Sequence, residues 1–384
     1  MNDTDSTAII RVQPTAQPLR VAVLGAGAGG AAACVELTLA GHAVVLWNRS
    51  AQALMPFIGT GCVQYEGVLG LGEARPVLIT DKIDTAVRGA DLILVCLPTL
   101  SHAPIARALA TIGSRVPVVL NPGHTGGALE FAHAYRAMAS SLGSDPTPPP
   151  IAEFNTLTYV CRKYHPARVT VTGRARALRV AALPGGESAL SLGQSIYDCA
   201  QAVPDVLYTS LANLNMALHA PCAILGAAWI EATKGDFTFY VQGMTSGVAR
   251  VMSALDAERL AVGRAFGHEL LGVAAEMQRV GTVDASVTDT NDLATAIASG
   301  DANKKIRAPD SLSHRYYRED FGHGLVPFIA LAQAAGVATP VAESLLRLGE
   351  TLTGEPFSQK GRTAATMGIE CLGLEALRAR VTTG

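Results

Sequence analysis

Two groups of polar residues interrupt the apolar second half of this chain. In the first group, Asn215 and His219 stand four residues apart, so on a helix they share one face. Because the pKa of histidine lies near neutral pH, His219 is a candidate general acid or base. By itself, however, a histidine in an apolar stretch is more often a hydrogen-bonded core residue. The second group, residues 313–320, is densely charged, and alone it is equally consistent with a solvated loop.

A glycine-rich motif near the N-terminus indicates a third candidate site. An apolar strand pattern at residues 21–24 runs into Gly25-x-Gly27-x-x-Gly30, and the patterns of a helix and a second strand follow. This order is the context that the dinucleotide-binding fingerprint requires. Gly25 permits the tight turn, Gly27 lets the backbone approach a pyrophosphate, and Gly30 lets the helix pack on the strand. We therefore predict a dinucleotide site at the helix N-terminus, with the binding residues Gly25, Gly27, Ala28, Gly29 and Gly30.

The end of the second predicted strand indicates which dinucleotide binds. Proteins that prefer NAD carry an acidic residue here, which accepts a hydrogen bond from the ribose 2′-hydroxyl. This chain instead has Asn48, Arg49 and Ser50, and its next acidic residue is Glu66. These side chains offer donors and a positive charge, and the planar fork of arginine matches a phosphate. The sequence favours NADP(H) as the cofactor, and NAD(H) remains possible.

The composition argues against several other classes of protein. Of the 384 residues, 49% are hydrophobic and 16% charged, which is typical of a globular protein with a large core. A net charge of −2 provides no basic field for nucleic acid or for an anionic membrane. The seven cysteines lack metal-like spacing, so we expect no metal site and free thiols in a reducing compartment, the cytoplasm. Two uncharged stretches, residues 211–230 and 321–342, contain polar residues and prolines, which favours buried helices over membrane spans.

The order of the predicted elements indicates an α/β protein with two domains. Strands alternate with helices in the first half, which predicts a Rossmann-type, doubly wound parallel sheet. Strand signals nearly vanish after residue 185. Long apolar-periodic segments there predict helices at residues 188–202, 210–233, 257–280 and 325–335, and so a mostly α-helical second domain. We expect a disordered tail at residues 1–19, the dinucleotide-binding domain at 20–190 and the helical substrate and catalytic domain at 191–384. The large apolar helical domain favours a homodimer.

Taken together, the two polar groups resemble the octopine/nopaline (opine) dehydrogenase family. His219 stands in the motif Asn-x-x-x-His-x-Pro, and the motif Arg315-Tyr-x-x-Glu-Asp320-x-x-x-Gly-Leu follows in the same half of the chain. Segments 97–102, 121–127 and 155–162 also resemble this family, and the resemblance covers about residues 21 to 355. The first of these segments resembles the family's nicotinamide loop, which adds three residues to the predicted cofactor site: Leu97, Pro98 and Thr99.

The resemblance implies a reaction and a role for each matching residue. The reaction would be an NAD(P)H-dependent reductive condensation of a 2-oxo acid with the amino group of an amino acid, giving a secondary amine. His219 would donate a proton opposite the hydride, and Asp320 would pair with the other ring nitrogen of His219. Arg315 would hold a substrate carboxylate, with Asn215 and Arg162 as further substrate-binding residues. Both small-molecule substrates are expected in a cleft between the domains.

Two other functions remain open at this stage. One is an NADP-dependent 2-oxoacid or β-hydroxyacid reductase with the same two-domain fold, in which no amine is condensed. Such relatives often use a lysine on the first helices of the second domain, but the surroundings of Lys234 do not resemble their pattern. The other is a non-catalytic NADP-sensing protein. The presence of both His219 and Asp320 argues against it, because a sensor has no need of a proton relay.

Overall fold

The first half of the chain forms a large sheet that carries the glycine-rich turn. In the computed structural model, which describes residues 9–290 and 292–383, this sheet has eight strands in the order β12-β11-β8-β7-β6-β1-β2-β5. The strands are β1 (Arg20–Leu24), β2 (Ala43–Trp47), β5 (Leu78–Thr80), β6 (Leu92–Val95), β7 (Val118–Leu120), β8 (Ile151–Phe154), β11 (Leu178–Ala182) and β12 (Ala200–Ala202). Neighbours pair in parallel except β8 and β11, so β11 and β12 form an antiparallel edge on an otherwise parallel sheet.

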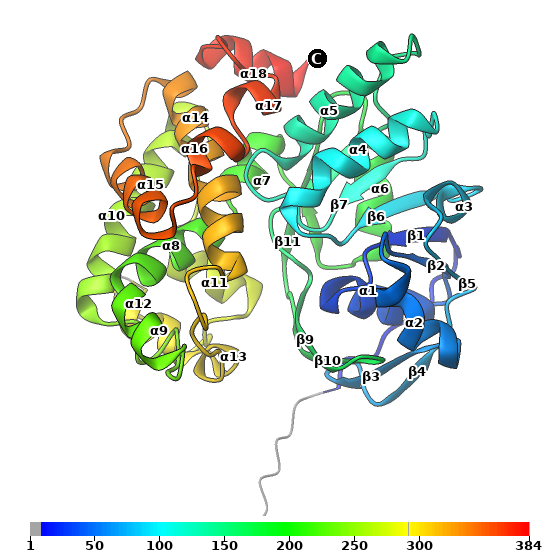
Figure 1. Cartoon of the computed structure of the whole chain (residues 1–384), viewed down its shortest axis with the longest axis horizontal. Helices are drawn as coiled ribbons and strands as arrows, with labels where there is room; N and C mark the ends of the chain where they lie inside the picture. Colours follow the sequence, from blue (N-terminus) through cyan, green and yellow to red (C-terminus); the bar gives the residue numbers. More distant parts are fainter. Residues whose placement is uncertain (1–8, 291, 384) are drawn as a thin grey trace, which may run out of the picture.

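Helices cover both faces of this sheet because its central strands are apolar on both sides. In β1, Val21 and Val23 belong to one core cluster, whereas Ala22 and Leu24 belong to the other. The first cluster includes residues of α1 (Ala28–Leu39), α2 (Ala51–Thr60) and α6 (Glu187–Ile196). The second includes residues of α3 (Ile83–Val87), α4 (His102–Thr111) and α5 (Gly127–Ser141). The predicted Rossmann-type, doubly wound fold is confirmed (Figure 1).

A smaller mixed sheet, which the sequence pattern did not separate from the first, packs against α1. Its order is β4-β3-β10-β9, and β3 pairs in parallel with β10. The strands are β3 (Val63–Gly67), β4 (Gly72–Ala74), β9 (Tyr159–His165) and β10 (Arg168–Arg174). From β9, Lys163 extends to the glycine-rich turn, where its Nζ atom lies near the carbonyl oxygen of Ala26.

The second half of the chain is helical, as expected. Its helices are α7 (Val206–Leu211), α8 (Asn215–Leu225), α9 (Ala227–Thr233), α10 (Ser246–Ala265), α11 (Val273–Val280), α12 (Leu293–Ser299), α13 (Asp301–Lys304), α14 (Val326–Ala335), α15 (Pro340–Thr353), α16 (Phe357–Lys360), α17 (Ala364–Met367) and α18 (Leu374–Thr382), with a π-helical segment, η2 (Tyr317–Leu325), before α14. Local signals explain several ends. Gly336, with φ of 68°, terminates α14, and Pro340 occupies the first turn of α15.

The boundaries differ from the predicted ones at three places. The predicted helix 188–202 ends at Ile196, and β12 then joins the sheet, so the predicted domain boundary at residue 190 falls inside α6. The predicted helix 257–280 is two helices, because the chain turns at Gly267, which has φ of 85°. Residues 1–8 of the predicted tail lie outside the described residues. The rest of that stretch packs on the first domain instead of forming a disordered tail, with Ile10 N donating to Val68 O.

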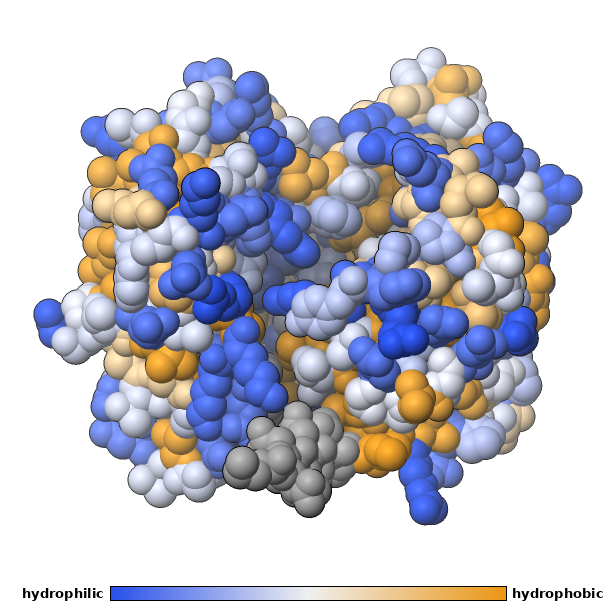
Figure 2. Space-filling model, turned by 60° about the horizontal axis from the view of Figure 1, so that its bottom comes forward, coloured by the Kyte–Doolittle hydropathy of each residue, from blue (hydrophilic) through white to orange (hydrophobic). Residues whose placement is uncertain are grey.

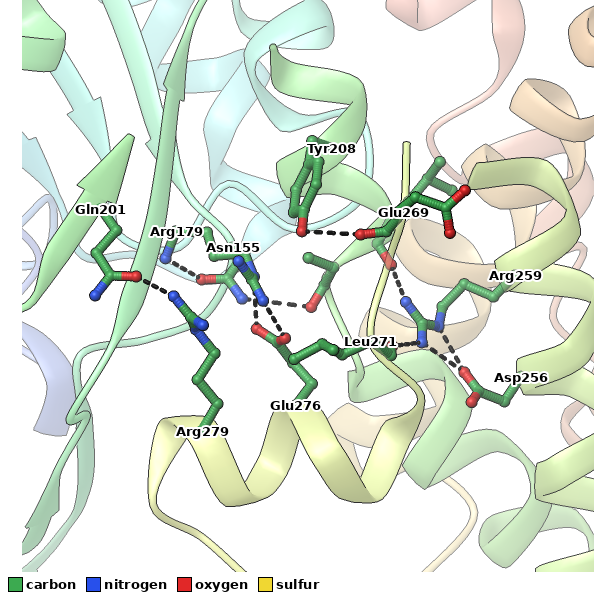
Figure 3. A network of polar contacts seen from close by, with 12 residues as sticks. Asn155, Arg179, Gln201, Tyr208, Asp256, Arg259, Glu269, Leu271, Glu276 and Arg279 are labelled. Carbon is green, nitrogen blue, oxygen red and sulfur yellow. Dashed lines mark hydrogen bonds and ion pairs between the residues drawn. The ribbon is translucent and has the colours of Figure 1, made fainter. Parts of the chain in front are cut away.

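The two domains are joined by buried polar contacts and by the end of the chain. Arg179 on β11 forms a two-pronged ion pair with Glu276 on α11, with nitrogen–oxygen distances of 2.8 and 2.6 Å (Figure 3). The C-terminal helices return to the first domain, where α17 packs against α5 (Figure 1). In the described part of the chain, no single helix is long and apolar enough to cross a membrane. Only Val206–Leu225 together with Ala227–Thr233, bent by 68°, meets that test, by length and composition alone.

Candidate active site

The glycine-rich turn forms a cradle whose shape requires glycine. Gly25 has φ of 127°, and a Cβ atom there would overlap the carbonyl oxygen of Cys96. A Cβ at Gly30 would overlap the carbonyl oxygen of Gly25. At Gly27, by contrast, a Cβ would meet nothing within 4 Å, and no side chain of the described residues caps the N-terminus of α1. Open space beside free N–H groups fits a pyrophosphate, so the cradle suits a dinucleotide. Ala28 and Gly29 form the first turn of α1 at this cradle.

The end of β2 places three predicted cofactor residues beside the cradle. The Asn48 side chain accepts a hydrogen bond from Ala26 N at 3.3 Å, which ties β2 to the turn. The Ser50 hydroxyl caps α2 by accepting from Ala53 N at 3.4 Å. Arg49 lies between them and is exposed. Two of the three side chains therefore shape the local backbone, and Arg49 offers the positive charge.

Lys163 is a cation at the cradle that the sequence analysis missed. Its Nζ atom lies 3.4 Å from the carbonyl oxygen of Ala26 and 4.3 Å from the centroid of the Phe57 ring. Partial burial lowers its pKa below the ordinary value. Lys163 comes from β9 of the second sheet, so no local pattern links it to the glycine motif.

The loops after β6 and β7 lie at the carboxyl edge of the sheet, where a nicotinamide is expected. Leu97 is half-buried and Pro98 exposed, whereas Thr99 is fully buried. The Thr99 hydroxyl accepts a hydrogen bond from Arg362 at 2.7 Å, so its side chain faces the protein. After β7, Asn121 accepts from the backbone N–H and the hydroxyl of Thr158, and among the described residues its amide nitrogen has no partner. A buried donor left open at this edge fits a polar cofactor group.

The predicted catalytic pair is in contact. His219 lies on α8 and Asp320 on η2, and the distance between His219 Nδ1 and Asp320 Oδ2 is 2.6 Å. Both residues are buried, with 8% and 3% of their surface exposed. A carboxylate at Nδ1 favours a proton on that nitrogen and leaves Nε2 to face a reactant. The segment that presents Asp320 is π-helical, a form that occurs frequently at functional sites.

Aromatic side chains surround this pair, and the sequence analysis assigned them no role. The Tyr316 ring stacks on the His219 ring, with centroids 3.8 Å apart and planes at 12°. Tyr240 and Phe239 lie farther out, at 6.2 and 6.3 Å. Burial raises the pKa of both tyrosines, so the phenols stay neutral. Tyr316 is adjacent to Arg315 in the sequence motif, which is the signal that could have identified it.

The predicted substrate-binding residues approach the pair from both domains. Arg315 is exposed and lies 2.9 Å from the buried carboxyl group of Glu319. Burial raises the pKa of Glu319, and the positive charge of Arg315 offsets part of this rise. Arg162, also exposed, extends from β9 of the first domain. The positive charges of both arginines oppose the rise in the pKa of Tyr316. Asn215 is half-buried at the first position of α8, one turn before His219.

Three buried histidines lie in the segments that form the site: His102 after β6, His124 after β7 and His323 in η2. Burial lowers the pKa of His102 well below its ordinary value, that of His124 to about 4 and that of His323 to about 3, and Arg362 adds to each effect. These rings are therefore neutral near pH 7. Within the described ranges, His102 Nε2 and His323 Nδ1 have no hydrogen-bond partner, and no group of three or more His, Cys, Asp or Glu side chains could hold a metal.

The site lies where the two domains face each other. Figure 2 shows the surface hollowed between the lobes, with hydrophilic side chains gathered around the hollow. The His219–Asp320 pair from the helical domain and the glycine-rich cradle from the first domain face each other across this cleft. The arrangement can transfer a hydride and a proton to a carbonyl or imine group between the domains.

Comparisons with known proteins agree with this geometry. The family model described as NAD/NADP octopine/nopaline dehydrogenase, alpha-helical domain, matches residues 202–353, and the model described as ketopantoate reductase PanE/ApbA matches residues 21–121. The opine dehydrogenase of Arthrobacter sp. (strain 1C) is 34% identical over 364 residues, which are 94% of this chain and 98% of the relative. The octopine dehydrogenase of Mizuhopecten yessoensis is 23% identical, over 75% of this chain and 76% of its own.

Solved structures share the fold over nearly the whole chain. A structure of octopine dehydrogenase in complex with NADH and agmatine has a TM-score of 0.74 at 20% identity, covering 95% of this chain and 98% of its own. Yersinopine dehydrogenase with NADP+ bound has a TM-score of 0.71 at 13% identity, covering 92% and 97%. At these identities the likeness shows the fold, and the Arthrobacter relative carries the assignment. The chain belongs to the opine dehydrogenase family of NAD(P)-dependent oxidoreductases, which act on CH–NH bonds.

Proposed function

We propose that this enzyme uses NADPH to condense a 2-oxo acid reductively with the amino group of an amino acid, giving a secondary amine that carries two carboxylates. The observation that carries the proposal is the buried His219–Asp320 contact at 2.6 Å, in the cleft opposite the dinucleotide cradle. A two-domain reductase that takes an oxo acid without an amine is the alternative. Residues 21–121 match a ketopantoate reductase model, which supports this alternative. That match lies within the cofactor domain, whereas the helical domain matches the octopine/nopaline dehydrogenase model.

The residues divide the chemistry between them. The bound cofactor supplies the hydride. His219 donates from Nε2 to the carbonyl oxygen and recovers protons from the attacking amine nitrogen, so the oxygen leaves as water carrying the two protons that the amine loses when the imine forms. His219 then donates one proton to the imine nitrogen as the hydride reaches the carbon. Asp320 holds the ring in the required tautomer and stabilises the imidazolium. Because the product has two carboxylates, one guanidinium from each domain, Arg315 and Arg162, suits its binding.

The choice of NADPH rests on charge at the end of β2. Arg49 is exposed there, and Lys163 adds a second cation at the cradle. No acidic residue stands at positions 48–50 to accept from a ribose hydroxyl. The related structures bind either cofactor, NADH in octopine dehydrogenase and NADP+ in yersinopine dehydrogenase.

The test is oxidation of reduced cofactor, followed by absorbance, with 2-oxo acids alone and then with a panel of amino acids. Oxidation only when both substrates are present supports the proposal, and oxidation by an oxo acid alone establishes the simple reductase instead. The His219→Asn variant should lower kcat by roughly 10² to 10⁴-fold, because proton transfer loses its donor. Its cofactor affinity should stay near that of the parent enzyme, which separates catalysis from binding. Turnover at the parent rate would contradict the assigned role of His219.

We also propose a reducing location, the cytoplasm. Among the described residues all seven cysteines are free thiols, and six of them are buried. Burial raises the pKa of several of these thiols, including Cys34 and Cys161 to about 12, so they stay protonated and unreactive.

A further inference from the structure

Arg362 occupies an unusual place for a charged residue. It lies between α16 and α17, beyond residues 202–353 that match the helical-domain family model, and none of its surface is exposed. A buried guanidinium is stable only when its donors are satisfied and its charge is balanced. The contacts of Arg362 therefore show what it holds together.

The side chain of Arg362 contacts both loops that face the nicotinamide position. Its Nη2 atom donates to the Thr99 hydroxyl at 2.7 Å, in the loop after β6, and lies 3.3 Å from His102 Nδ1. Its Nη1 atom donates to the carbonyl oxygens of Thr125 at 2.7 Å and Gly123 at 3.4 Å, in the loop after β7. One planar group thus ties together the two loops at the carboxyl edge of the sheet.

The charge of Arg362 is balanced inside the first domain. Its Nε atom donates to Glu130 on α5 at 2.9 Å, and Glu130 is itself buried. The neighbouring turn fits closely as well, because a Cβ atom at Gly126 would lie 3.4 Å from the Cδ atom of Arg362. The guanidinium is consequently held in one orientation.

The backbone of the same residue contacts the segment that carries Asp320. The Arg362 N–H donates to the carbonyl oxygen of Gly322 at 2.8 Å, two residues after Asp320 in η2. At Gly361 a Cβ atom would overlap that same carbonyl oxygen, so glycine permits the close approach. The backbone of Arg362 thus holds the catalytic segment, and its side chain holds the nicotinamide loops.

We propose that Arg362 is a positioning residue that sets the distance between the hydride donor and the His219–Asp320 pair. The expected effect of Arg362 on the rate rests on the proposed function, whereas its role in holding the loops and the Asp320 segment together does not. Arg362 joins two loops of the first domain to the segment that carries Asp320 in the second domain. A shift of the loops relative to that segment is therefore restrained by this one residue. Because misplacement by about 1 Å costs roughly 100-fold in rate, loss of this connection should lower kcat.

The first experiment compares Arg362→Lys with the matched control Arg179→Lys. Lysine keeps the charge opposite Glu130 but cannot reach both loops, whereas Arg179 forms the other buried interdomain ion pair and has no contact to these loops. Hydrogen exchange, measured without substrate, should rise together in segments 97–102, 121–127 and 317–325 of Arg362→Lys. Parent-like exchange in these segments, or an equal rise in Arg179→Lys, would overturn the proposal. This readout needs no turnover, so it separates failure of the inference from failure of the proposed function.

The second experiment measures kinetics with the substrate pair that supports turnover. For Arg362→Lys we expect kcat to fall by roughly 10- to 100-fold and the isotope effect with deuterated NADPH to increase, because hydride transfer becomes slower. The dissociation constant for NADPH should change less than kcat, since the pyrophosphate cradle is elsewhere. The double variant Arg362→Met with Glu130→Gln, which buries no charge, should show the same kinetic loss if its fold is intact. Parent-like kcat and isotope effect in either variant would overturn the proposal.

Discussion

At the scale of single residues, the proposed chemistry assigns proton transfer to His219 and gives its neighbours the task of holding the ring. His219 has its Nδ1 bound to Asp320 and its ring stacked on Tyr316, so two neighbours hold the imidazole in place. The neutral histidines nearby add no competing positive charge near pH 7, because burial holds the pKa values of His124 and His323 far below neutrality. His219 is therefore the proposed proton donor, and the imidazole rings of His124 and His323 beside it are neutral.

The proposed preference for NADPH rests mainly on one residue, Arg49. Replacing Arg49 with alanine removes the exposed guanidinium at the end of β2, and we expect the dissociation constant for NADPH to rise by roughly 10- to 100-fold, the range of a charge-assisted hydrogen bond. The constant for NADH should change little, because NADH lacks the 2′-phosphate. Fluorescence titration of both cofactors measures this.

The matched control for this test is Arg88→Ala, which removes another exposed arginine that pairs with Asp84 at the surface. That variant should bind both cofactors like the parent enzyme. An equal loss of affinity for NADH and NADPH in Arg49→Ala would show that Arg49 supports the loop and does not recognise the phosphate.

At the scale of elements, the contact between α8 and η2 keeps the catalytic pair together. Gly324 in η2 lies against Met216 in α8, and a Cβ atom at Gly324 would lie only 2.8 Å from the Met216 Cβ atom. Both helices are buried along this contact, so the side chains of His219 and Asp320 have no room to rotate away from each other. The absence of a side chain at Gly324 therefore allows His219 and Asp320 to meet.

Gly324→Ala should push α8 and η2 apart and lengthen the His219–Asp320 hydrogen bond. We expect a loss of stability of about 1 to 3 kcal/mol, as for other overpacked cores, and a fall in kcat beyond the change in folded fraction. Chemical unfolding and steady-state kinetics measure the two effects. Gly322→Ala is the control from the same segment, because its Cβ would meet its nearest neighbour at 3.6 Å. Equal effects of the two substitutions would contradict this account.

At the scale of the whole molecule, buried polar contacts hold the domains around the cleft. Besides the Arg179–Glu276 pair, Glu153 of β8 lies at the junction of the domains with 1% of its surface exposed. Its carboxyl group accepts from Ala128 N at 2.8 Å, at the start of α5, and from the Thr209 hydroxyl at 2.6 Å, on α7. Burial raises its pKa to about 7, and the hydrogen bonds from its neighbours reduce the shift.

This carboxyl group makes stability depend on pH. Its pKa is higher in the folded state than the ordinary 4.5, so the folded state binds the proton more tightly. The resulting stabilisation is complete below about pH 4.5 and is lost as the pH rises through about 7. Relative to Glu153→Gln, the parent protein should lose roughly 3 kcal/mol of unfolding free energy over that window. Chemical unfolding at a series of pH values measures the difference.

Both proteins contain the same buried histidines, whose lowered pKa values make the free energy of unfolding fall as the pH drops below 6.5. Because this contribution is common to both proteins, the difference between them reports on Glu153. A difference between the parent and Glu153→Gln that does not vary with pH would contradict the raised pKa of Glu153 in the folded protein.

Short-range patterns in the sequence by themselves indicated the glycine-rich turn, the two-domain order and the residues of the proposed catalytic pair. Gly30 is required by a local contact, because a Cβ there would overlap the carbonyl oxygen of Gly25, and Gly25 itself has φ of 127°. The spacing of apolar residues likewise indicated most strands and helices, because side-chain periodicity is a local property. The motifs around His219 and Asp320 named the two residues, although only the family resemblance indicated that they meet.

The tertiary structure alone decided what lies beside those residues. Asp320 is 101 positions from His219, Lys163 reaches the glycine turn from a separate sheet, and Arg362 crosses from the C-terminal segment into the first domain. Such contacts depend on how whole elements pack, which no local pattern encodes. A buried arginine and an exposed one look alike in a sequence. Only the folded chain shows which one has its charge balanced and its donors satisfied.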